Sequence, residues 1–368
     1  MKYEKIKLSD LVDTVSDTRK INKDKVVLIN TSDIFDGDVL NHSYTDNSNL
    51  RGQFKKRFEK NDILYSEIRP ANKRFAYVDF DSEDYIASTK LMVLRKRSNS
   101  ITNRFLYYCL TNDFFTEKMQ HLAEARSGTF PQITFDVLKN ESINVPSIEN
   151  QNKITMILDN INNKIKSNNE INNNLYDEAV ALYKDKFKGI GQGKKTIGDY
   201  IVPKRGKNLL TRDAIDGDTP VVAGGIDPSA YHNQFNTKSP VITISASGAN
   251  AGYTNLWNIP VWASDCSYID DSITKNVYFW YIVLKTRQNE IFDAQTGSAQ
   301  PHIYPQHIAE MSIGELNIAE VEKYNNLVAP LFKMIGENQK ENKKLSELRD
   351  TLLPKLMNGE IDLDNIEI

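Results

Sequence analysis

The stretch SGTFPQITFDVLKNESINVPSIENQNKITMILDNINNKIKSNNEINNNLYDEAVALYKDKFKG, residues 127–189, decides the fold because the chain contains it twice. Residues 297–359 read GSAQPHIYPQHIAEMSIGELNIAEVEKYNNLVAPLFKMIGENQKENKKLSELRDTLLPKLMNG, and a constant offset of 170 residues aligns the two copies without a gap. Identical residues coincide along the whole alignment, as at Pro131 and Pro301, Leu175 and Leu345, and Gly189 and Gly359. A gap-free match of this length indicates an internal repeat.

The second half of each copy has helical periodicity. Its stripe residues recur at alternating steps of four and three, the spacing of a coiled coil. The first stripe consists of Ile154, Leu158, Ile161, Ile165, Asn168, Asn172, Leu175, Ala179 and Leu182. The second consists of Tyr324, Val328, Leu331, Ile335, Asn338, Asn342, Leu345, Arg349 and Leu352. We therefore expect two helices of up to about 40 residues, roughly 60 Å each, that pair through these stripes.

Both stripes place two asparagines at the same central steps. A buried asparagine in an apolar seam costs stability but fixes register and partner. If the helices pair antiparallel, Asn168 and Asn172 meet Asn338 and Asn342 near the middle and can satisfy each other. The alternative is that an asparagine-rich sequence tolerates this residue anywhere; we favour the register role.

The ends of the helices carry their own signals. Asn317 followed by Glu320 fits a capping box at the start of the second helix. Gly189 and Gly359 stand where a glycine ends a helix. Pro354 is expected to kink the second helix or end it early.

The segments between the helices also correspond, more loosely. They are rich in Val, Ile, Tyr and Thr and are broken by Gly, Pro, Asn and Asp, which predicts short strands and turns. The matching segments are 6–12 with 196–202, 61–78 with 239–256, and 85–94 with 261–270. A short aromatic-rich helix is expected to follow in each, at 103–119 and 276–292. The order is globular domain, long helix, globular domain, long helix.

Composition excludes several classes of protein. Among 368 residues there are two cysteines and five histidines, too few for a disulfide framework or a four-cysteine zinc site. The N-terminus has no apolar signal core and no 18 apolar residues run together, so we expect a cytoplasmic protein without a membrane segment. The net charge of −3 argues, taken as an average, against a nucleic-acid binder.

Positive residues nevertheless cluster. The clusters are Arg51, Lys55, Lys56 and Arg57; Arg69, Lys73 and Arg74; and Lys204, Arg205, Lys207 and Arg212. Such clusters on loops neutralise DNA phosphates. Solvated faces of ordinary strands are the alternative, and on charge alone that alternative is favoured.

Sequence readout needs side chains that reach base edges. In the first domain the candidates lie in a turn after an apolar strand: Arg69, Asn72, Lys73 and Arg74. The matching turn of the second domain is small and polar, and its candidates are Ser247 and Asn250, with His232 and Tyr253 as additional contacts. Core packing is an equally good interpretation of Tyr253.

Motifs for catalysis are missing. The stretch GIGQGKKT at 189–196 departs from a phosphate-binding loop in its spacing and follows a helix instead of a strand, so we interpret it as a linker. No amino-methyltransferase motif and no dinucleotide fingerprint occur. The sequence therefore predicts a protein without catalytic residues and without a metal site of its own.

The two-fold pattern resembles the specificity subunits of type I restriction–modification systems over essentially the whole chain. The phrase that closes each recognition domain in that family is similar to Ser127-Gly128-Thr129 with Gln132-Ile133, and to Gly297-Ser298 with Pro301-His302-Ile303. The second copy departs from the first by a swapped Gly-Ser order. The ending LRDTLLPKLMNGEIDL at 348–363 is also similar to that of the family.

This resemblance implies an α+β fold with a pseudo-two-fold internal repeat. Two recognition domains of mixed, mostly antiparallel strands would be separated by two long antiparallel coiled-coil helices. The expected boundaries are 1–146 for target-recognition domain 1, 147–190 for spacer helix 1, 191–316 for target-recognition domain 2 and 317–368 for spacer helix 2. With the resemblance, DNA contact becomes the favoured interpretation of the basic loops.

The resemblance also implies partners. The subunit would read a bipartite site in double-stranded DNA, one half-site per recognition domain, while the helices set the spacer between half-sites. The helices would also carry two methyltransferase (modification) subunits, joined by restriction/translocase subunits. S-adenosylmethionine, ATP and magnesium would belong to those partners, and this chain would have no cofactor and no catalysis. The alternatives are a self-contained restriction endonuclease and a coiled-coil adaptor without DNA specificity.

Overall fold

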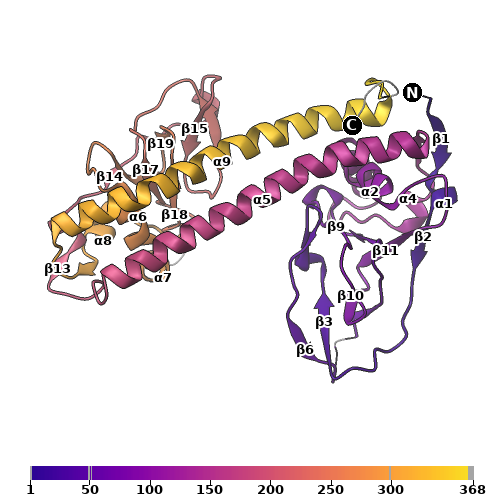
Figure 1. Ribbon diagram of the computed structural model, residues 1–368, viewed down its shortest axis with the longest axis horizontal. Coiled ribbons are helices and arrows are strands. Elements are labelled where there is room, and N and C mark those ends of the chain that lie inside the picture. The colour runs from indigo at the N-terminus through magenta and orange to yellow at the C-terminus, as the bar shows by residue number, and fades with distance from the viewer. Residues whose placement is uncertain (1, 49, 51, 298–299, 364–368) are drawn as a thin grey trace. The chain divides into compact units, whose positions relative to one another are not determined.

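The computed structural model of the chain describes residues 2–48, 50, 52–297 and 300–363. Its two longest helices are α5 (Ile148–Lys186) and α9 (Ile318–Asn358), labelled in Figure 1. The chain divides into two compact units, of which the first comprises Met1–Asn163 and Leu345–Ile368 and the second comprises Lys164–Lys344. Each long helix therefore contributes one part to each unit.

Each unit contains a four-stranded main sheet of the same topology. In the first unit the order is β2 (Val12–Val15), β11 (Leu91–Lys96), β8 (Ile63–Ser66), β9 (Phe75–Tyr77). In the second it is β14 (Lys204–Arg205), β20 (Cys266–Asp270), β17 (Val241–Ser245), β18 (Thr254–Trp257). All pairings in both sheets are antiparallel. The internal repeat thus extends through the globular parts.

Each unit also contains a smaller sheet with one parallel pairing. The first unit has the order β6 (Tyr44–Asp46), β3 (Lys25–Ile29), β10 (Tyr85–Ser88), β7 (Phe54–Lys56), in which β3 and β10 are parallel. The second has β16 (Ala230–His232), β15 (Thr219–Val222), β19 (Trp262–Ala263), in which β15 and β19 are parallel. The first unit adds a separate hairpin, β4 (Ile34–Phe35) with β5 (Asp38–Val39).

A two-stranded ladder leads into each long helix. It joins β1 (Glu4–Lys7) to β12 (Ser142–Val145), and β13 (Lys195–Thr196) to β21 (Ser312–Ile313). Lys7 lies opposite Ser142, and Thr196 lies opposite Ser312, the repeat image of Ser142. The equal-length match of 6–12 with 196–202 is therefore wrong by one residue, because backbone pairing makes Lys7 the counterpart of Thr196.

The aromatic helices are broken where one helix each was expected. The first unit has α2 (Asn103–Thr111) and α3 (Asp113–Arg126), and the second has α6 (Val277–Thr286) and α7 (Gln288–Asp293). At Asn112 the backbone turns extended, and the Asn112 side chain accepts a hydrogen bond from the backbone N–H of Phe115 at 2.9 Å. This N-cap starts α3 afresh, which the aromatic pattern alone did not reveal.

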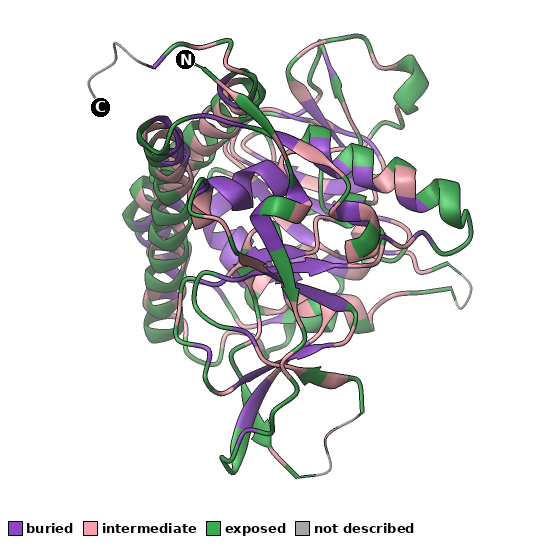
Figure 2. Cartoon of the chain, turned by 90° about the vertical axis from the view of Figure 1, so that its right-hand side faces the viewer, coloured by how far each residue is buried: buried purple, intermediate pink, exposed green. Residues whose placement is uncertain are grey.

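The remaining helices are short. They are α1 (Leu8–Leu11), α4 (Phe135–Leu138), α8 (Pro305–Ala309) and the 3-10 turns η1 (Thr31–Asp33), η2 (Pro70–Asn72), η3 (Ile197–Asp199) and η4 (Thr211–Asp213). Figure 2 shows buried residues gathered in the sheets and their covering helices, while the outer faces of the long helices are exposed.

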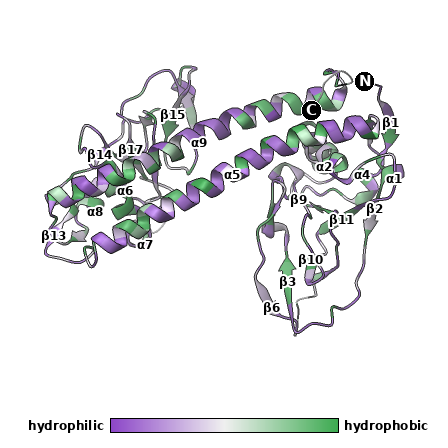
Figure 3. Ribbon diagram, viewed as in Figure 1, coloured by the Kyte–Doolittle hydropathy of each residue, from purple (hydrophilic) through white to green (hydrophobic). Residues whose placement is uncertain are grey.

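Every residue from Val277 to Leu284 in α6 is buried. Along α5 and α9, hydrophilic and hydrophobic residues alternate in bands (Figure 3).

Within the second unit, α5 and α9 run antiparallel. Asn168 donates to the side-chain oxygen of Asn342 at 2.8 Å, and Asn338 donates to that of Asn172 at 2.8 Å. The repeat offset of 170 turns Asn168 into Asn338 and Asn172 into Asn342, so each pair is the image of the other. The two asparagine pairs are therefore related by a local two-fold symmetry within this part of the coiled coil.

The mixed α+β class with two long coiled-coil helices is confirmed, and one detail of α9 is corrected. Asn317 caps α9, as expected, by accepting from the backbone N–H groups of Ala319 and Glu320, but the Glu320 carboxylate accepts from Lys323 at 2.8 Å and, among the described hydrogen bonds, does not complete the expected capping box. Pro354 does not end α9, which continues to Asn358. The final turn persists because Leu356 and Met357 are buried in the core of the first unit.

Candidate nucleic-acid interface

In the first unit, the loop that joins β8 to β9 is fixed on the segment that closes the recognition domain. We call residues 67–74 recognition loop 1. The backbone N–H of Arg69 donates to the carbonyl of Pro131 at 3.1 Å, and the N–H of Ile133 donates to the carbonyl of Glu67 at 2.8 Å. The repeated segment that contains Pro131 and Ile133 therefore holds this loop in place.

The second unit repeats this arrangement. Residues 246–253 join β17 to β18, and we call them recognition loop 2. The N–H of Gly248 donates to the carbonyl of Pro301 at 3.1 Å, and the N–H of Ile303 donates to the carbonyl of Ala246 at 2.9 Å. Pro301 and Ile303 are the repeat images of the residues that hold recognition loop 1, so the two loops are equivalent.

The two loops share their backbone and differ in their side chains. Arg69 and Lys73 have φ angles of 44° and 52°, and Gly248 and Gly252 at the same places have 81° and 86°. Left-handed backbone costs a residue with a Cβ about 1–2 kcal/mol, which glycine avoids. Recognition loop 1 therefore holds two cations in strained positions, a feature that clusters at functional sites.

Two of the four predicted side chains in recognition loop 1 are available to a ligand. Arg69 and Asn72 are both exposed. Among the residues that the structure describes, none forms a hydrogen bond or ion pair with the Arg69 guanidinium or the Asn72 amide. Arg69 thus combines a fixed backbone with a free planar donor, the group that reads guanine bidentately in the major groove.

The other two side chains are engaged within the domain. The Lys73 ammonium pairs with Asp113 of α3 at 2.7 Å. Arg74 donates to the backbone carbonyl of Ile34 at 3.0 Å, and its guanidinium lies over the Phe35 ring at 5.3 Å from the ring centre. Arg74 therefore ties recognition loop 1 to the β4–β5 hairpin.

The basic stretch before β8 is divided by strand alternation. Arg51 lies outside the described residues, and Lys55 is exposed on β7. The Lys56 ammonium donates to the carbonyls of Thr89 and Leu91 at 3.0 and 2.8 Å, and burial lowers the pKa of this lysine. Lys55 therefore faces solvent, while Lys56 ties β7 to the strands beside it.

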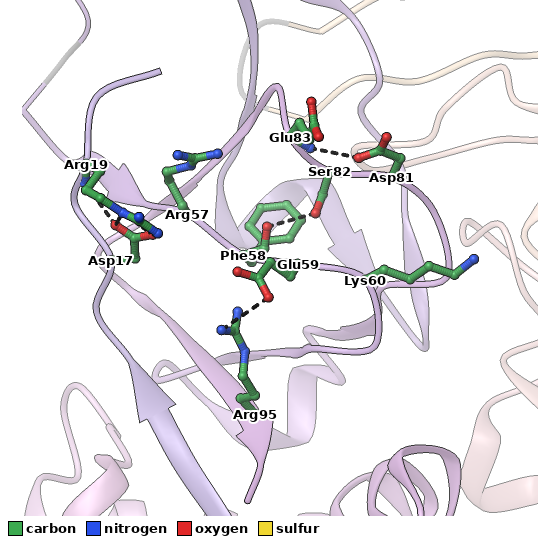
Figure 4. Close-up of a pocket in the computed structure, with 10 residues that line it drawn as sticks. All are labelled: Asp17, Arg19, Arg57, Phe58, Glu59, Lys60, Asp81, Ser82, Glu83 and Arg95. Atoms are coloured by element: carbon green, nitrogen blue, oxygen red, sulfur yellow. Dashed lines mark hydrogen bonds and ion pairs between the residues drawn. The ribbon is translucent and has the colours of Figure 1, made fainter. Parts of the chain in front are cut away.

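The fourth basic residue, Arg57, lines a cavity of about 340 Å³ (Figure 4). The ten lining residues are Asp17, Arg19, Arg57, Phe58, Glu59, Lys60, Asp81, Ser82, Glu83 and Arg95. Hydrogen bonds from the Arg19 side chain lower the pKa of Asp17 to about 2. Acids and bases are equal in number on this lining, so the cavity lacks the positive excess that a phosphate needs.

Around recognition loop 2 an aspartate organises the polar groups. Asp265 accepts from the Arg205 guanidinium at 2.5 Å and from the Ser247 hydroxyl. Its counterpart beside recognition loop 1 is Lys90, because the N–H of Ala246 donates to the carbonyl of Asp265 as that of Glu67 donates to the carbonyl of Lys90. Both groups are paired, Lys90 with Glu67 at 3.9 Å and Asp265 with Arg205, so the sign of the charge at this place differs between the loops but is balanced in each.

Three further basic residues of the second domain are exposed. Lys204 lies on β14, and the Lys207 ammonium lies 6.0 Å from the centre of the Trp262 ring. Arg212 in η4 is 3.8 Å from Asp213. All three remain predicted DNA contacts, because their cations reach solvent.

The remaining candidates of the second domain are more enclosed. His232 is buried, and its Nδ1 accepts from the backbone N–H of Ile215 at 2.9 Å. Asn250 and Tyr253 are half-buried, and the Lys285 ammonium lies 4.4 Å from the Tyr253 ring centre. His232 thus holds the fold in place, whereas Asn250 and Tyr253 keep part of their surface open.

The predicted helix-pairing residues lie at the buried or half-buried positions of α5 and α9. Buried are Ile154, Leu158, Ile161 and Asn168. Half-buried are Ile165, Asn172, Leu175, Leu331, Ile335, Asn338, Asn342 and Leu345.

Asp113, Asp265 and the β4–β5 hairpin were missed by sequence reasoning. Nothing in the local sequence of either aspartate marks it as a loop partner, because each ion pair joins segments that are distant in the chain. The hairpin did carry a signal, because Asp36-Gly37 is a two-residue turn sequence typical of tight hairpins.

None of the described helices combines the length and the apolar character that a membrane span requires.

Comparison with known proteins supplies a family. Residues 1–176 match the model of the type I restriction modification DNA specificity domain. The HindI specificity subunit of Haemophilus influenzae is 39% identical over 198 residues, a match that covers 53% of this chain and 43% of that subunit. The match with this chain therefore covers less than half of the length of that subunit.

Other similarities extend further along the chain. The MjaIX specificity subunit of Methanocaldococcus jannaschii is 25% identical over 309 residues, 73% of this chain and 71% of that subunit. A crystal structure of the type I restriction-modification S subunit from M. genitalium shares the fold, with a TM-score of 0.58 and 19% identity over 97% of this chain and 96% of that one. The chain is therefore similar to the type I restriction modification DNA specificity domain over residues 1–176 and to the MjaIX specificity subunit over 73% of its length.

Proposed function

We propose that this protein is a non-catalytic DNA-specificity subunit in which each recognition domain reads one half of a bipartite site. The observation that carries the proposal is the pair of equivalent recognition loops, one of which keeps Arg69 and Lys73 in left-handed backbone. A strained loop with an unpaired guanidinium is suited to binding DNA, which offers negatively charged phosphates and hydrogen-bond acceptors on the planar bases.

The division of labour within each loop supports sequence reading. The shared backbone suits what any two half-sites have in common, the sugar-phosphate chain. The side chains differ, with Arg69 in one loop and Gly248 in the other, and Lys90 beside one where Asp265 stands beside the other. Two loops with different side chains favour different base sequences.

The long helices have the part of spacer and platform in this proposal. The paired asparagines fix the register of α5 against α9, which suits a rod that holds two half-sites at one distance. We place two methyltransferase subunits on the helices, with restriction/translocase subunits added to them. S-adenosylmethionine, ATP and magnesium then arrive with those partners.

The test is to produce the chain with the methyltransferase subunit of its own system and to map modified adenines on genomic DNA. The proposal expects one sequence in two parts separated by a fixed gap, and no modification when this chain is omitted. Modification independent of the chain, or without sequence preference, contradicts it and favours the adaptor. Cleavage of DNA by the purified chain with magnesium alone would instead establish the endonuclease.

A further inference from the structure

The β4–β5 hairpin belongs to the same surface as recognition loop 1. The N–H of Asp36 donates to the carbonyl of Lys73 at 2.9 Å, and the N–H of Gly37 donates to the carbonyl of Phe75 at 3.0 Å. A Cβ added at Gly37 would lie 2.5 Å from the Tyr107 hydroxyl oxygen, so the turn fits tightly against the domain. The hairpin is therefore held rigidly beside the loop.

The hairpin presents an aromatic ring to solvent. Phe35 is 48% exposed, and the Arg74 guanidinium lies over its ring. An exposed apolar ring beside a DNA-binding loop can make a favourable contact only with an apolar group on the edge of a base. The 5-methyl group of thymine is the apolar feature of the major groove, and phenylalanine has no hydrogen-bonding group with which to read another base.

The second domain differs at this place. The connection between β15 and β16, residues 223–229, replaces the longer connection of the first domain, and Ile226 on it is 49% exposed. It also packs against recognition loop 2, because a Cβ added at Gly224 would lie 2.7 Å from the carbonyl oxygen of Ser247. Since the domains are copies of one fold, segments that diverge next to equivalent loops are where different half-sites must be distinguished.

We propose that Phe35 is a specificity-determining residue that packs against a thymine methyl group in the first half-site, with Ile226 in the corresponding place for the second. This inference rests on the proposed function, because it assumes that the first domain reads one half-site. It adds a second reading element, the β4–β5 hairpin, to recognition loop 1.

The experiment uses the complex of the full chain with its methyltransferase subunits and duplexes that carry the mapped site. Each thymine of the first half-site is replaced in turn by deoxyuridine, which removes only the methyl group. One of these replacements should raise the Kd of the unaltered complex about fourfold. This is the effect expected when one buried carbon group is lost from the interface. With Phe35→Ala the same replacement should have no effect, while Phe35→Leu should keep part of it.

Ile226→Ala is the reciprocal variant, since it removes the exposed apolar side chain proposed to contact the second half-site, and it should abolish the uracil response of that half-site. It should leave the uracil response of the first half-site unchanged. If Phe35→Ala only loosens Arg74, affinity falls on every duplex and the uracil response persists, which overturns the inference. A half-site without a uracil-sensitive thymine also overturns it. Absence of any sequence preference in the unaltered complex would instead defeat the proposed function.

Discussion

At the scale of single residues, Arg69 and Arg74 show how one loop assigns different tasks to the same side chain. Arg69 is exposed and its backbone is left-handed, while Arg74 donates to the carbonyls of Ser32 and Ile34. The first arrangement costs stability and leaves the guanidinium free. The second uses the guanidinium to hold the β4–β5 hairpin against the loop.

Arg69→Gly tests this assignment, because it reproduces the residue found at Gly248. Relief of the left-handed strain should leave the free energy of unfolding unchanged or raise it by about 1 kcal/mol. Affinity for the first half-site should fall about tenfold or more, as expected when a base-reading arginine is lost. Denaturant unfolding and binding to half-site variants measure the two effects.

Arg74→Ala is the matched comparison in the same loop. It leaves two carbonyl groups without their donor and removes the ring contact, so stability should fall by about 1–2 kcal/mol. A result in which Arg69→Gly destabilises the fold more than Arg74→Ala would contradict the assignment.

At the scale of elements, the recognition domains meet the long helices through chemically different contacts. In the first unit Asp159 of α5 accepts from Arg104 at 2.7 Å and from the Tyr108 hydroxyl at 2.6 Å, and Asn162 donates to that hydroxyl at 3.0 Å. The repeat images of Asp159 and Asn162 on α9 are Ala329 and Phe332.

The second unit therefore joins its domain to α9 by apolar packing. Phe332 stacks on Tyr278 with ring centres 5.0 Å apart and meets Tyr281 edge-on at 5.6 Å. The offset of 170 shows in the sequence that these positions differ. The sequence does not show which residues they contact, because Arg104 and Tyr108 reach Asp159 only when α2 packs against α5.

Asp159→Ala should destabilise the first unit by about 2 kcal/mol, because Arg104 and Tyr108 lose a shared acceptor in a partly buried place. Ala329→Gly, a similarly small change at the image position, should cost about 1 kcal/mol or less through helix propensity. Urea unfolding of the two variants gives the comparison. A loss for Asp159→Ala that does not exceed the loss for Ala329→Gly would contradict the expected contribution of the polar network.

The asparagine pairs are the second element-scale feature. Asn168 is buried, and its side-chain oxygen has no partner among the described atoms, while its nitrogen donates to Asn342 and Glu341. A buried polar group in this condition costs stability and is kept for register. The asparagine stripes were readable from the sequence, whereas the unpaired oxygen was not.

Replacing both members of one pair by leucine should therefore stabilise the coiled coil. Asn168→Leu with Asn342→Leu should raise the thermal midpoint by a few degrees, equivalent to about 1 kcal/mol or more. The image pair, Asn172→Leu with Asn338→Leu, should gain less, because these side chains are only half-buried. Differential scanning calorimetry decides it, and a lowered midpoint for the first pair would sink the idea.

At the scale of the whole molecule, the repeat explains which features the sequence predicts. The offset that aligns Pro131 with Pro301 also identifies the seats of both recognition loops, and the coiled-coil stripes give α5 and α9. The break at Asn112 and the hairpin at Phe35 follow from local capping and turn chemistry that the aromatic pattern hides. The ion pairs of Asp113 and Asp265 join distant segments, which no local pattern encodes.

The spacer role of the helices gives a prediction for the complete complex. Deleting seven residues, two turns, from the middle of both α5 and α9 removes one heptad from each and keeps the stripes in phase. The gap between half-sites should shorten while both half-site sequences persist. Mapped adenine modification shows the gap directly, and an unchanged gap would rule out the spacer role.

We propose that each recognition domain reads its own half of one DNA site. The most direct measurement replaces residues 1–146 with the first recognition domain of another specificity subunit and maps modified adenines across a genome in complex with the methyltransferase subunits. The first half-site should change, while the second half-site and the gap should stay as they were. A change in both half-sites, or in neither, would contradict it.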